Sequence, residues 1–202
     1  MIAPVEFPRR LLLAILSLLL LVPLAGCDMP PRRESFADLT FQHLPPIRLD
    51  VARIEVVEAY RRSADPDRIE NDFPTHPGVG AARWGRDRLQ AVGADGLARY
   101  TVLEASVVAT RLPRTTGLVG AFTQDQSDRY DALLQVRLEV NNRAGAQSGV
   151  ITAEARDSAT ATEDMTLNQR EQLWFAMTQR LLDTLNAELE TQIDTHFGIF
   201  LR

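Results

Sequence analysis

The stretch RYDALLQVRLEV, residues 129–140, gives the clearest structural signal in this chain of 202 residues. Apolar side chains occupy every second position, with mostly polar residues between them, and they are Tyr130, Ala132, Leu134, Val136, Leu138 and Val140. Successive side chains of a β-strand point to opposite faces of its sheet. The alternation therefore predicts a strand with one face on a core and one face near water, which is typical of antiparallel sheets.

The segments on either side of this stretch also have the pattern of strands. Residues 141–145, NNRAG, form a turn signal, and residues 148–158 follow as a strand, so the two strands should pair as a hairpin. Residues 98–112 predict a further strand before the hairpin. Residues 47–60 predict another, in which the apolar phase shifts by one residue. That shift indicates a β-bulge, unless the strand is buried on both faces.

Two segments have helical spacing. Residues 76–92 predict a helix, because Ala82, Gly85, Leu89 and Val92 recur at intervals of three and four, and Gly93 is a natural stop. A longer helix should close the chain, beginning at Asn168 as N-cap, with Glu171 at the third helical position, and running to about residue 195. Its apolar stripe comprises Trp174, Met177, Leu181, Leu185 and Leu189, widened by Thr178 and Leu182.

The order of elements is therefore β-α-β-β-β-α over residues 47–202. Packing both helices on one face of a mainly antiparallel sheet of about four strands gives an α+β two-layer sandwich, and we expect one domain of this class. The last residues, HFGIFLR at 196–202, are apolar for a chain end. They either dock on the domain or contact a partner.

The beginning of the chain has the pattern of an export signal. Residues 1–10 end in Arg9 and Arg10, and residues 11–24 carry no charge. A basic start, a short apolar run and small residues before a cleavage point are typical of a secretory signal, predicted here over residues 1–26. The apolar run is short for a membrane span, which needs about 20 residues.

The four residues at the end of this signal, Leu24-Ala25-Gly26-Cys27, resemble the lipobox of bacterial lipoproteins. The resemblance implies that Leu24, Ala25 and Gly26 are read as the recognition signal. It also implies that the Cys27 sulfur takes a diacylglycerol, that the chain is cut before Cys27, and that the new amine is acylated. Two or more acyl chains anchor a protein stably, since each buried methylene contributes about 0.8 kcal/mol. Cys27 is the only cysteine, so no internal disulfide is expected.

Residues 27–46 should connect the anchor to the domain. Proline pairs at residues 30–31 and 45–46 favour extended chain, while Phe36, Leu39 and Phe41 indicate that part of this tether lies on the domain or on the bilayer surface. Removing residues 1–26, with a net charge of +1, leaves 176 residues with a net charge of −6, since the full chain carries −5. That charge, without a basic patch, argues against nucleic-acid binding.

Several candidate chemical sites fail on their spacing. His43, His76 and His196 are not at metal-ligand spacing, and the acidic loop at residues 61–75 lacks the pattern of a calcium loop. Gly78-Val79-Gly80 suggests a dinucleotide loop, but Arg83 stands where the third glycine belongs. Ser148 lacks the spacing of a nucleophile elbow. We therefore expect no catalytic residues, no metal and no cofactor, and a protein that is not an enzyme.

One loop has the composition of a contact site. Residues 113–127, PRTTGLVGAFTQDQS, place Leu118, Val119 and Phe122 among small residues with polar residues on both sides. An exposed apolar tip marks a contact with a partner protein or with lipid. The loop could equally fold back and cap the core, and the sequence leaves both readings open.

Together with the lipobox, the element order over residues 47–195 resembles two groups of envelope lipoproteins. These are the lipopolysaccharide-assembly lipoproteins and the auxiliary lipoproteins of ABC-type transporters. The resemblance implies a periplasm-facing accessory or assembly factor that acts by binding an envelope protein or lipid. The alternative is a structural or regulatory lipoprotein that contacts the cell wall or a cell-wall synthase. Asp28 resembles an inner-membrane retention signal, whereas the fold analogy favours the outer membrane.

Overall fold

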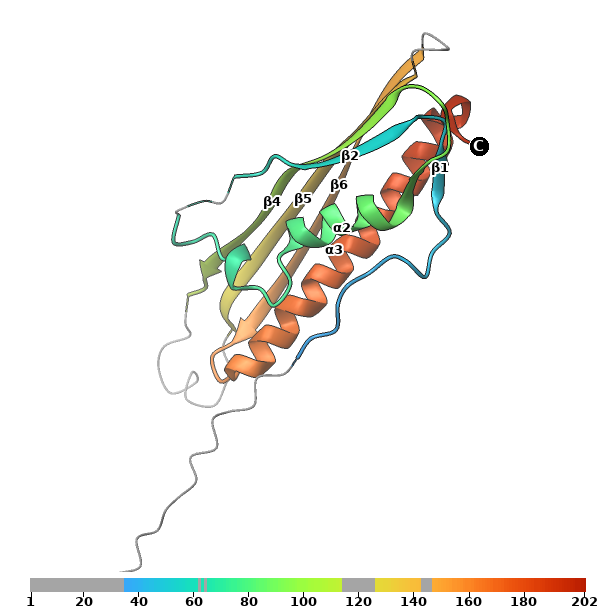
Figure 1. Ribbon diagram of the computed structural model, residues 1–202. Helices are drawn as coiled ribbons and strands as arrows, with labels where there is room; N and C mark the ends of the chain where they lie inside the picture. The colour runs from blue at the N-terminus through green and yellow to red at the C-terminus, as the bar shows by residue number, and fades with distance from the viewer. Residues whose placement is uncertain (1–34, 62, 64, 114–125, 143–146) are drawn as a thin grey trace, which may run out of the picture. The chain divides into compact units, whose positions relative to one another are not determined.

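A four-stranded sheet forms one layer of the computed structural model, which describes residues 35–202 except 62, 64, 114–125 and 143–146 (Figure 1). The strand order is β2-β4-β5-β6. The last three strands pair antiparallel, and β2 lies parallel to β4. The bounds are β2 Arg53–Glu58, β4 Leu97–Arg111, β5 Gln126–Asn142 and β6 Gln147–Thr162.

Strand β5 confirms the alternation seen in the sequence. Leu134, Val136 and Leu138 are fully buried, and Arg137 between them is exposed. The predicted hairpin is confirmed as well, because Leu138 of β5 lies opposite Ile151 of β6. On its other side Leu138 lies opposite Tyr100 of β4, so the core faces of the three long strands are in register. The α+β class with a mainly antiparallel sheet is therefore confirmed.

The segment predicted as one bulged strand, residues 47–60, forms two strands in two different sheets. Strand β1, Ile47–Leu49, pairs in parallel with β3, Leu89–Ala91, in a small separate sheet. The chain then bends at Asp50, where the Val51 amide donates to the Leu49 carbonyl at 2.8 Å, and β2 begins at Arg53. The prediction of a bulge was wrong, because the phase shift marks the bend between two strands. A bulge occurs instead in β4, between Val102 and Glu104.

Helix α2 spans Pro77–Arg88 and ends four residues before the predicted end at residue 92. Leu89 is already extended, with φ −91° and ψ 128°, because it begins β3. The helix lies unusually close to its neighbours. A Cβ on Gly80 would lie 2.6 Å from Leu182 Cδ1, and one on Gly85 would lie 2.7 Å from Tyr100 Cδ1. These glycines therefore serve close packing of the helix.

Helix α3, Leu167–His196, covers the same face of the sheet as α2 (Figure 1). The ring of Trp84 in α2 stacks on Tyr100 of β4, and the ring of Trp174 in α3 contacts Tyr130 of β5. Both tyrosines belong to the core face of the sheet. The predicted apolar stripe of α3 is confirmed, and its buried residues are Trp174, Met177, Thr178, Leu181, Leu182, Leu185, Leu189 and Ile193.

The N-cap of α3 is Thr166 instead of the predicted Asn168. The Thr166 hydroxyl accepts from the Gln169 amide at 3.3 Å, and the Gln169 side chain accepts from the Thr166 amide at 2.8 Å. This reciprocal pair is a capping box. Asn168 is the second residue of the helix, two positions after the cap, so it is not the N-cap.

Replacing Thr166 with alanine should lower the free energy of unfolding by about 0.5–2 kcal/mol, because the Gln169 amide loses its acceptor. The matched control is Asn168→Ala, which should change that free energy by less than about 0.5 kcal/mol. Urea denaturation followed by far-UV circular dichroism measures both variants. A larger loss for Asn168→Ala than for Thr166→Ala would contradict the observed cap.

Both ends of the described chain pack on the domain. Phe197 and Phe200 of the apolar tail are buried, and their rings lie against Gly149 of β6. The tail therefore caps the core, and Ile199 is the one large apolar side chain of residues 196–202 that is exposed. At the other end, the Phe36 ring lies 5.0 Å from the Phe175 ring of α3, and Phe41 is buried. Residues 36–46 thus follow α3 along the domain (Figure 1).

Candidate binding site

The site residues predicted from the sequence lie outside the described residues. This applies to the lipidation residue Cys27, to its recognition residues Leu24, Ala25 and Gly26, and to the loop residues Leu118, Val119 and Phe122. Within the described part of the chain, no helix combines the length and the apolar character needed to cross a bilayer.

The structure does place the two ends of that loop. The Leu112 amide donates to the Ser127 carbonyl at 2.9 Å, so the loop leaves and re-enters the sheet at adjacent positions. Arg170, in the first turn of α3, lies 3.7 Å from Asp128. Phe36 contacts α3 only one turn further on, at Phe175. We call this end of the domain, with Leu112, Ser127 and the first turns of α3, the anchor end.

The acidic segment at residues 61–75 contributes to the packing of the domain. Its Glu70 is buried and accepts from Arg68 Nε at 3.1 Å and from the Val107 amide at 3.2 Å. Arg68 also donates to Glu104 at 3.0 Å, so this network braces the loop against β4. Within the described residues, no group of three His, Cys, Asp or Glu side chains could hold a metal ion.

Tyr100 is a buried titratable group with no hydrogen-bond partner for its hydroxyl among the described residues. Burial raises the pKa of the Tyr100 hydroxyl far above its usual range, because the phenolate would lie in an apolar surrounding. The hydroxyl therefore stays protonated at all physiological pH values. It packs against α2 and is not available as a base.

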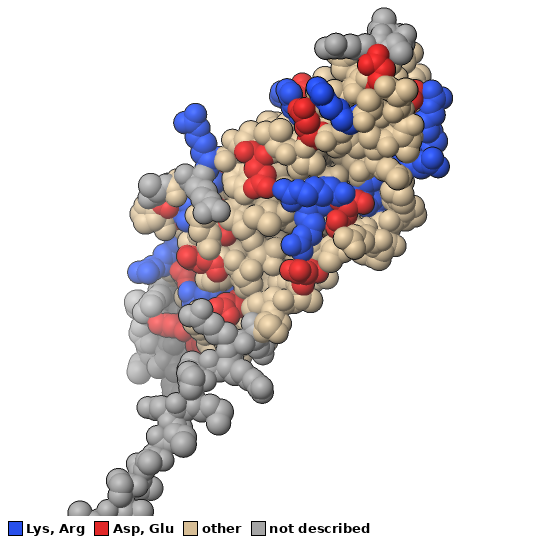
Figure 2. Space-filling view, viewed as in Figure 1, with Lys and Arg blue, Asp and Glu red and all other residues tan. Residues whose placement is uncertain are grey.

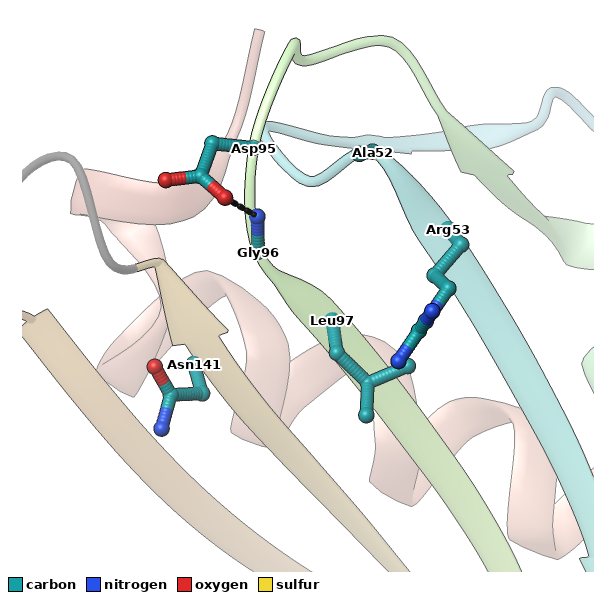
Figure 3. A pocket seen from close by; sticks show the side chains of 6 residues that line it. All are labelled: Ala52, Arg53, Asp95, Gly96, Leu97 and Asn141. Atoms are coloured by element: carbon teal, nitrogen blue, oxygen red, sulfur yellow. Dashed lines mark hydrogen bonds between the residues drawn. The ribbon is translucent and has the colours of Figure 1, made fainter.

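A polar hollow lies where β2 and β4 begin and β5 ends (Figure 3). Its volume is about 270 Å³. Asp95 accepts from the Gly96 amide at 2.7 Å, and Gly96 has a φ of +90°, so the turn requires glycine there. Arg53 lies 3.7 Å from Glu55, and 69% of its side chain is exposed. Arg53 is thus exposed and close to an acidic partner, and Asp95 is bonded to a neighbouring amide, so neither side chain favours ligand binding in this hollow.

A second pocket lies at the opposite end of the domain from Phe36, between the end of α2, the last turns of α3 and β1. Its volume is about 330 Å³. We call it the Arg88 pocket, and its lining residues are Pro45, Pro46, Ile47, Arg48, Arg88, Glu190, Ile193, Asp194, Leu201 and Arg202. Basic side chains gather at this end of the molecule, where β1 and the C-terminus lie (Figures 1 and 2).

Arg88 is the unusual residue of this pocket. Only 4% of its side chain is exposed, and its Nη2 donates to Glu190 Oε1 at 2.6 Å. Its Nε and Nη1 are buried and have no acceptor among the described residues. The guanidinium carbon also lies 6.0 Å from the ring centroid of Trp84. The pocket therefore contains a held cation with unused donors, which is the chemistry of an anion site.

Comparison with known proteins adds little to this geometry. No protein-family model and no curated protein matches the sequence. Among solved structures, rare lipoprotein B from Shewanella oneidensis is similar over 71% of this chain and 95% of its own, with 10% identity and a TM-score of 0.37. A minor lipoprotein from Acinetobacter baumannii is similar over 73% and 93%, with 16% identity and a TM-score of 0.34. At these values neither likeness establishes a family or a function.

Proposed function

We propose that this chain is a lipid-anchored, periplasm-facing lipoprotein of the bacterial envelope that acts by binding. We infer that it serves as an accessory or assembly factor of the machinery that handles envelope lipid, lipopolysaccharide or ABC-type transport. The observation that carries the proposal is the run Leu24-Ala25-Gly26-Cys27 at the end of an export signal.

The contacts of Phe36 support a short tether. Phe36 is nine positions after Cys27, and an extended chain spans at most about 3.5 Å per residue, or roughly 30 Å in all. Phe36 is fixed on α3 at the anchor end. An anchor on Cys27 would thus hold this end of the domain within about 30 Å of the bilayer.

The ends of the loop at 113–127 lie at the anchor end, so the loop joins the domain on the side of the tether. We infer that Leu118, Val119 and Phe122 contact a partner protein or lipid at the membrane. Changing these three residues to serine should reduce crosslinking to the partner in cells about tenfold or more, since the apolar contact is removed. The free energy of unfolding should change by less than about 0.5 kcal/mol, because surface substitutions have small effects.

The matched control changes three polar residues of the same loop, Thr115, Thr116 and Gln124, to serine. It should leave crosslinking unchanged. If the apolar variant crosslinks as well as the unaltered chain, the loop is not the contact. If that variant instead loses several kcal/mol of stability, the three residues cap the core.

The intact mass of the protein extracted from bacterial membranes tests the anchor. The expected mass is that of a chain beginning at Cys27 plus a diacylglycerol and an amide-linked acyl chain. A chain that retains residues 1–26, or an unmodified Cys27, would overturn the proposal. The identity of the crosslinked partner tests the role: a transport or translocon component supports it, whereas a cell-wall synthase would favour a structural or regulatory lipoprotein.

A further inference from the structure

The buried guanidinium of Arg88 has fewer hydrogen-bond acceptors than donors within the described residues. Glu190 supplies one acceptor, at Nη2, but Nε and Nη1 are buried with none among the described residues. A buried donor without an acceptor costs about 1–3 kcal/mol, and more when the group is charged. An acceptor is therefore expected beside the guanidinium, supplied either by a ligand or by water.

The position of the guanidinium is fixed, as a binding group requires. Arg88 is the last residue of α2, and Trp84, one turn earlier, lies beneath it. Trp84 is itself fully buried, and its indole nitrogen donates to Asn186 of α3 at 2.8 Å. Arginine donors arranged in a fixed plane match the oxygens of a carboxylate or a phosphate group.

Part of the wall of the Arg88 pocket is apolar, and the rest is charged. The apolar residues come from three separate segments of the chain, namely Pro45 and Ile47 before and in β1, Ile193 in α3, and Leu201 in the tail. A volume of about 330 Å³ lies at the lower end of the range of small-molecule sites. A pocket whose wall is half apolar and half charged fits a ligand with a short hydrocarbon body and a charged group better than a simple hydrated ion.

The charged residues around the pocket determine which net charge of a ligand is favoured. Arg48, which forms no ion pair within the described part of the chain, and Arg202, which pairs with Asp50, both line it and attract anions. Glu190 and Asp194 also line the pocket, and they would repel a ligand with several negative charges. A single anionic group beside Arg88 satisfies both conditions.

We propose that the Arg88 pocket binds an amphiphilic anion, a molecule with one carboxylate or phosphate group on a short apolar body. The anionic group accepts from Arg88, and the apolar body lies against Pro45, Ile47, Ile193 and Leu201. Glu190 competes with the ligand for the guanidinium and limits its affinity. This site lies within the domain and does not involve Cys27, so its test is independent of the proposed lipid anchor.

Isothermal titration calorimetry of the full chain in a non-ionic detergent tests the proposal, with octanoate as probe and protein-free detergent as blank. Octanoate should saturate one site. Acetate, inorganic phosphate and octanol, which each lack one half of the proposed ligand, should bind about tenfold more weakly or worse. Octyl phosphate is titrated as a second probe. If it binds more tightly than octanoate, the preferred anionic group is a phosphate, and if it binds more weakly, the preferred group is a carboxylate.

Two variants give opposite expectations. Arg88→Lys should weaken octanoate binding about tenfold or more, because an ammonium group lacks the planar donors. Glu190→Gln should strengthen octanoate binding by about threefold to tenfold, because the competing negative charge is removed. Glutamine has nearly the same volume as glutamate, so the packing is kept. Arg53→Gln, in the polar hollow at β2, is the matched control and should leave binding unchanged.

Three results would overturn the proposal. Octanoate binding no tighter than octanol would show partition of the tail without an anion site. Acetate or phosphate binding as tightly as octanoate would show a simple anion site without a role for the apolar walls. Unchanged octanoate affinity in Glu190→Gln, which should fold even if Arg88→Lys does not, would show that the ligand does not bind at the guanidinium that Glu190 contacts.

Discussion

Replacing Trp84 with alanine should lower the free energy of unfolding by about 3–5 kcal/mol, the usual range for an aromatic residue removed from a core. Trp84 is fully buried between α2 and the sheet, and its ring lies 5.4 Å from the ring of Tyr100. It also joins the two helices through its hydrogen bond to Asn186. The substitution leaves a cavity where both helices meet the sheet, and it removes the donor that satisfies Asn186.

Urea denaturation of the whole chain measures this loss, and two variants calibrate it. Trp84→Phe keeps an aromatic ring on Tyr100 but loses the indole donor, so it should cost less, about 1–3 kcal/mol. Ile199→Ala removes an apolar side chain that is 64% exposed, and it should cost less than about 0.5 kcal/mol. A loss below about 1 kcal/mol for Trp84→Ala would contradict the packing of α2 on the sheet.

The parts of the fold that the sequence predicts correctly are those in which the signal is local. The alternation over residues 129–140 comes from one strand with one buried face, so the type of each residue, apolar or polar, indicates whether it is buried or exposed. The apolar stripe from Trp174 to Leu189 likewise indicates the buried face of a helix that packs along its whole length. The hairpin follows from the first signal, because the short turn at residues 141–145 brings the next strand back beside the first one.

The errors arise where a neighbour in space decides the structure. The helical spacing of Ala82, Gly85, Leu89 and Val92 continues beyond α2, yet Leu89 leaves the helix because it pairs with Ile47. The same pairing divides residues 47–60 into two strands. The N-cap is the exception, because its signal is local. Thr166 and Asn168 are both good caps by type, and Gln169, three residues after Thr166, reaches back to the Thr166 amide and decides between them.

The Arg88 pocket could not have been predicted from the sequence. Arg88 and its partner Glu190 are 102 residues apart, and the apolar walls come from segments as distant as Pro45 and Leu201. An arginine in the last turn of a helix is ordinary, because it interacts favourably with the helix dipole. Only the packed structure shows that this arginine is buried and that two of its nitrogens have no acceptor in the described residues.

Changing Cys27 to serine should release the protein from its membrane. Serine cannot form the thioether that carries the diacylglycerol, and a signal that depends on Cys27 would not be cut at that residue. Two or more acyl chains hold a protein stably, at about 0.8 kcal/mol for each buried methylene, so their loss removes nearly all of the attachment. The measurement is the distribution of the protein between the soluble fraction and membranes washed with alkaline carbonate.

The matched control is Asp28→Ser, which alters the residue after the lipidated cysteine and keeps the anchor. We expect this variant to stay in the membrane fraction, and its density on a sucrose gradient tests whether Asp28 acts as an inner-membrane retention signal. The Cys27→Ser protein should appear in the soluble fraction or keep residues 1–26 as an uncleaved precursor. A Cys27→Ser chain that is cut to its usual length and still resists the carbonate wash would show that the attachment does not depend on this cysteine. In that case the apolar residues Leu118, Val119 and Phe122 would become the first candidates for the membrane contact.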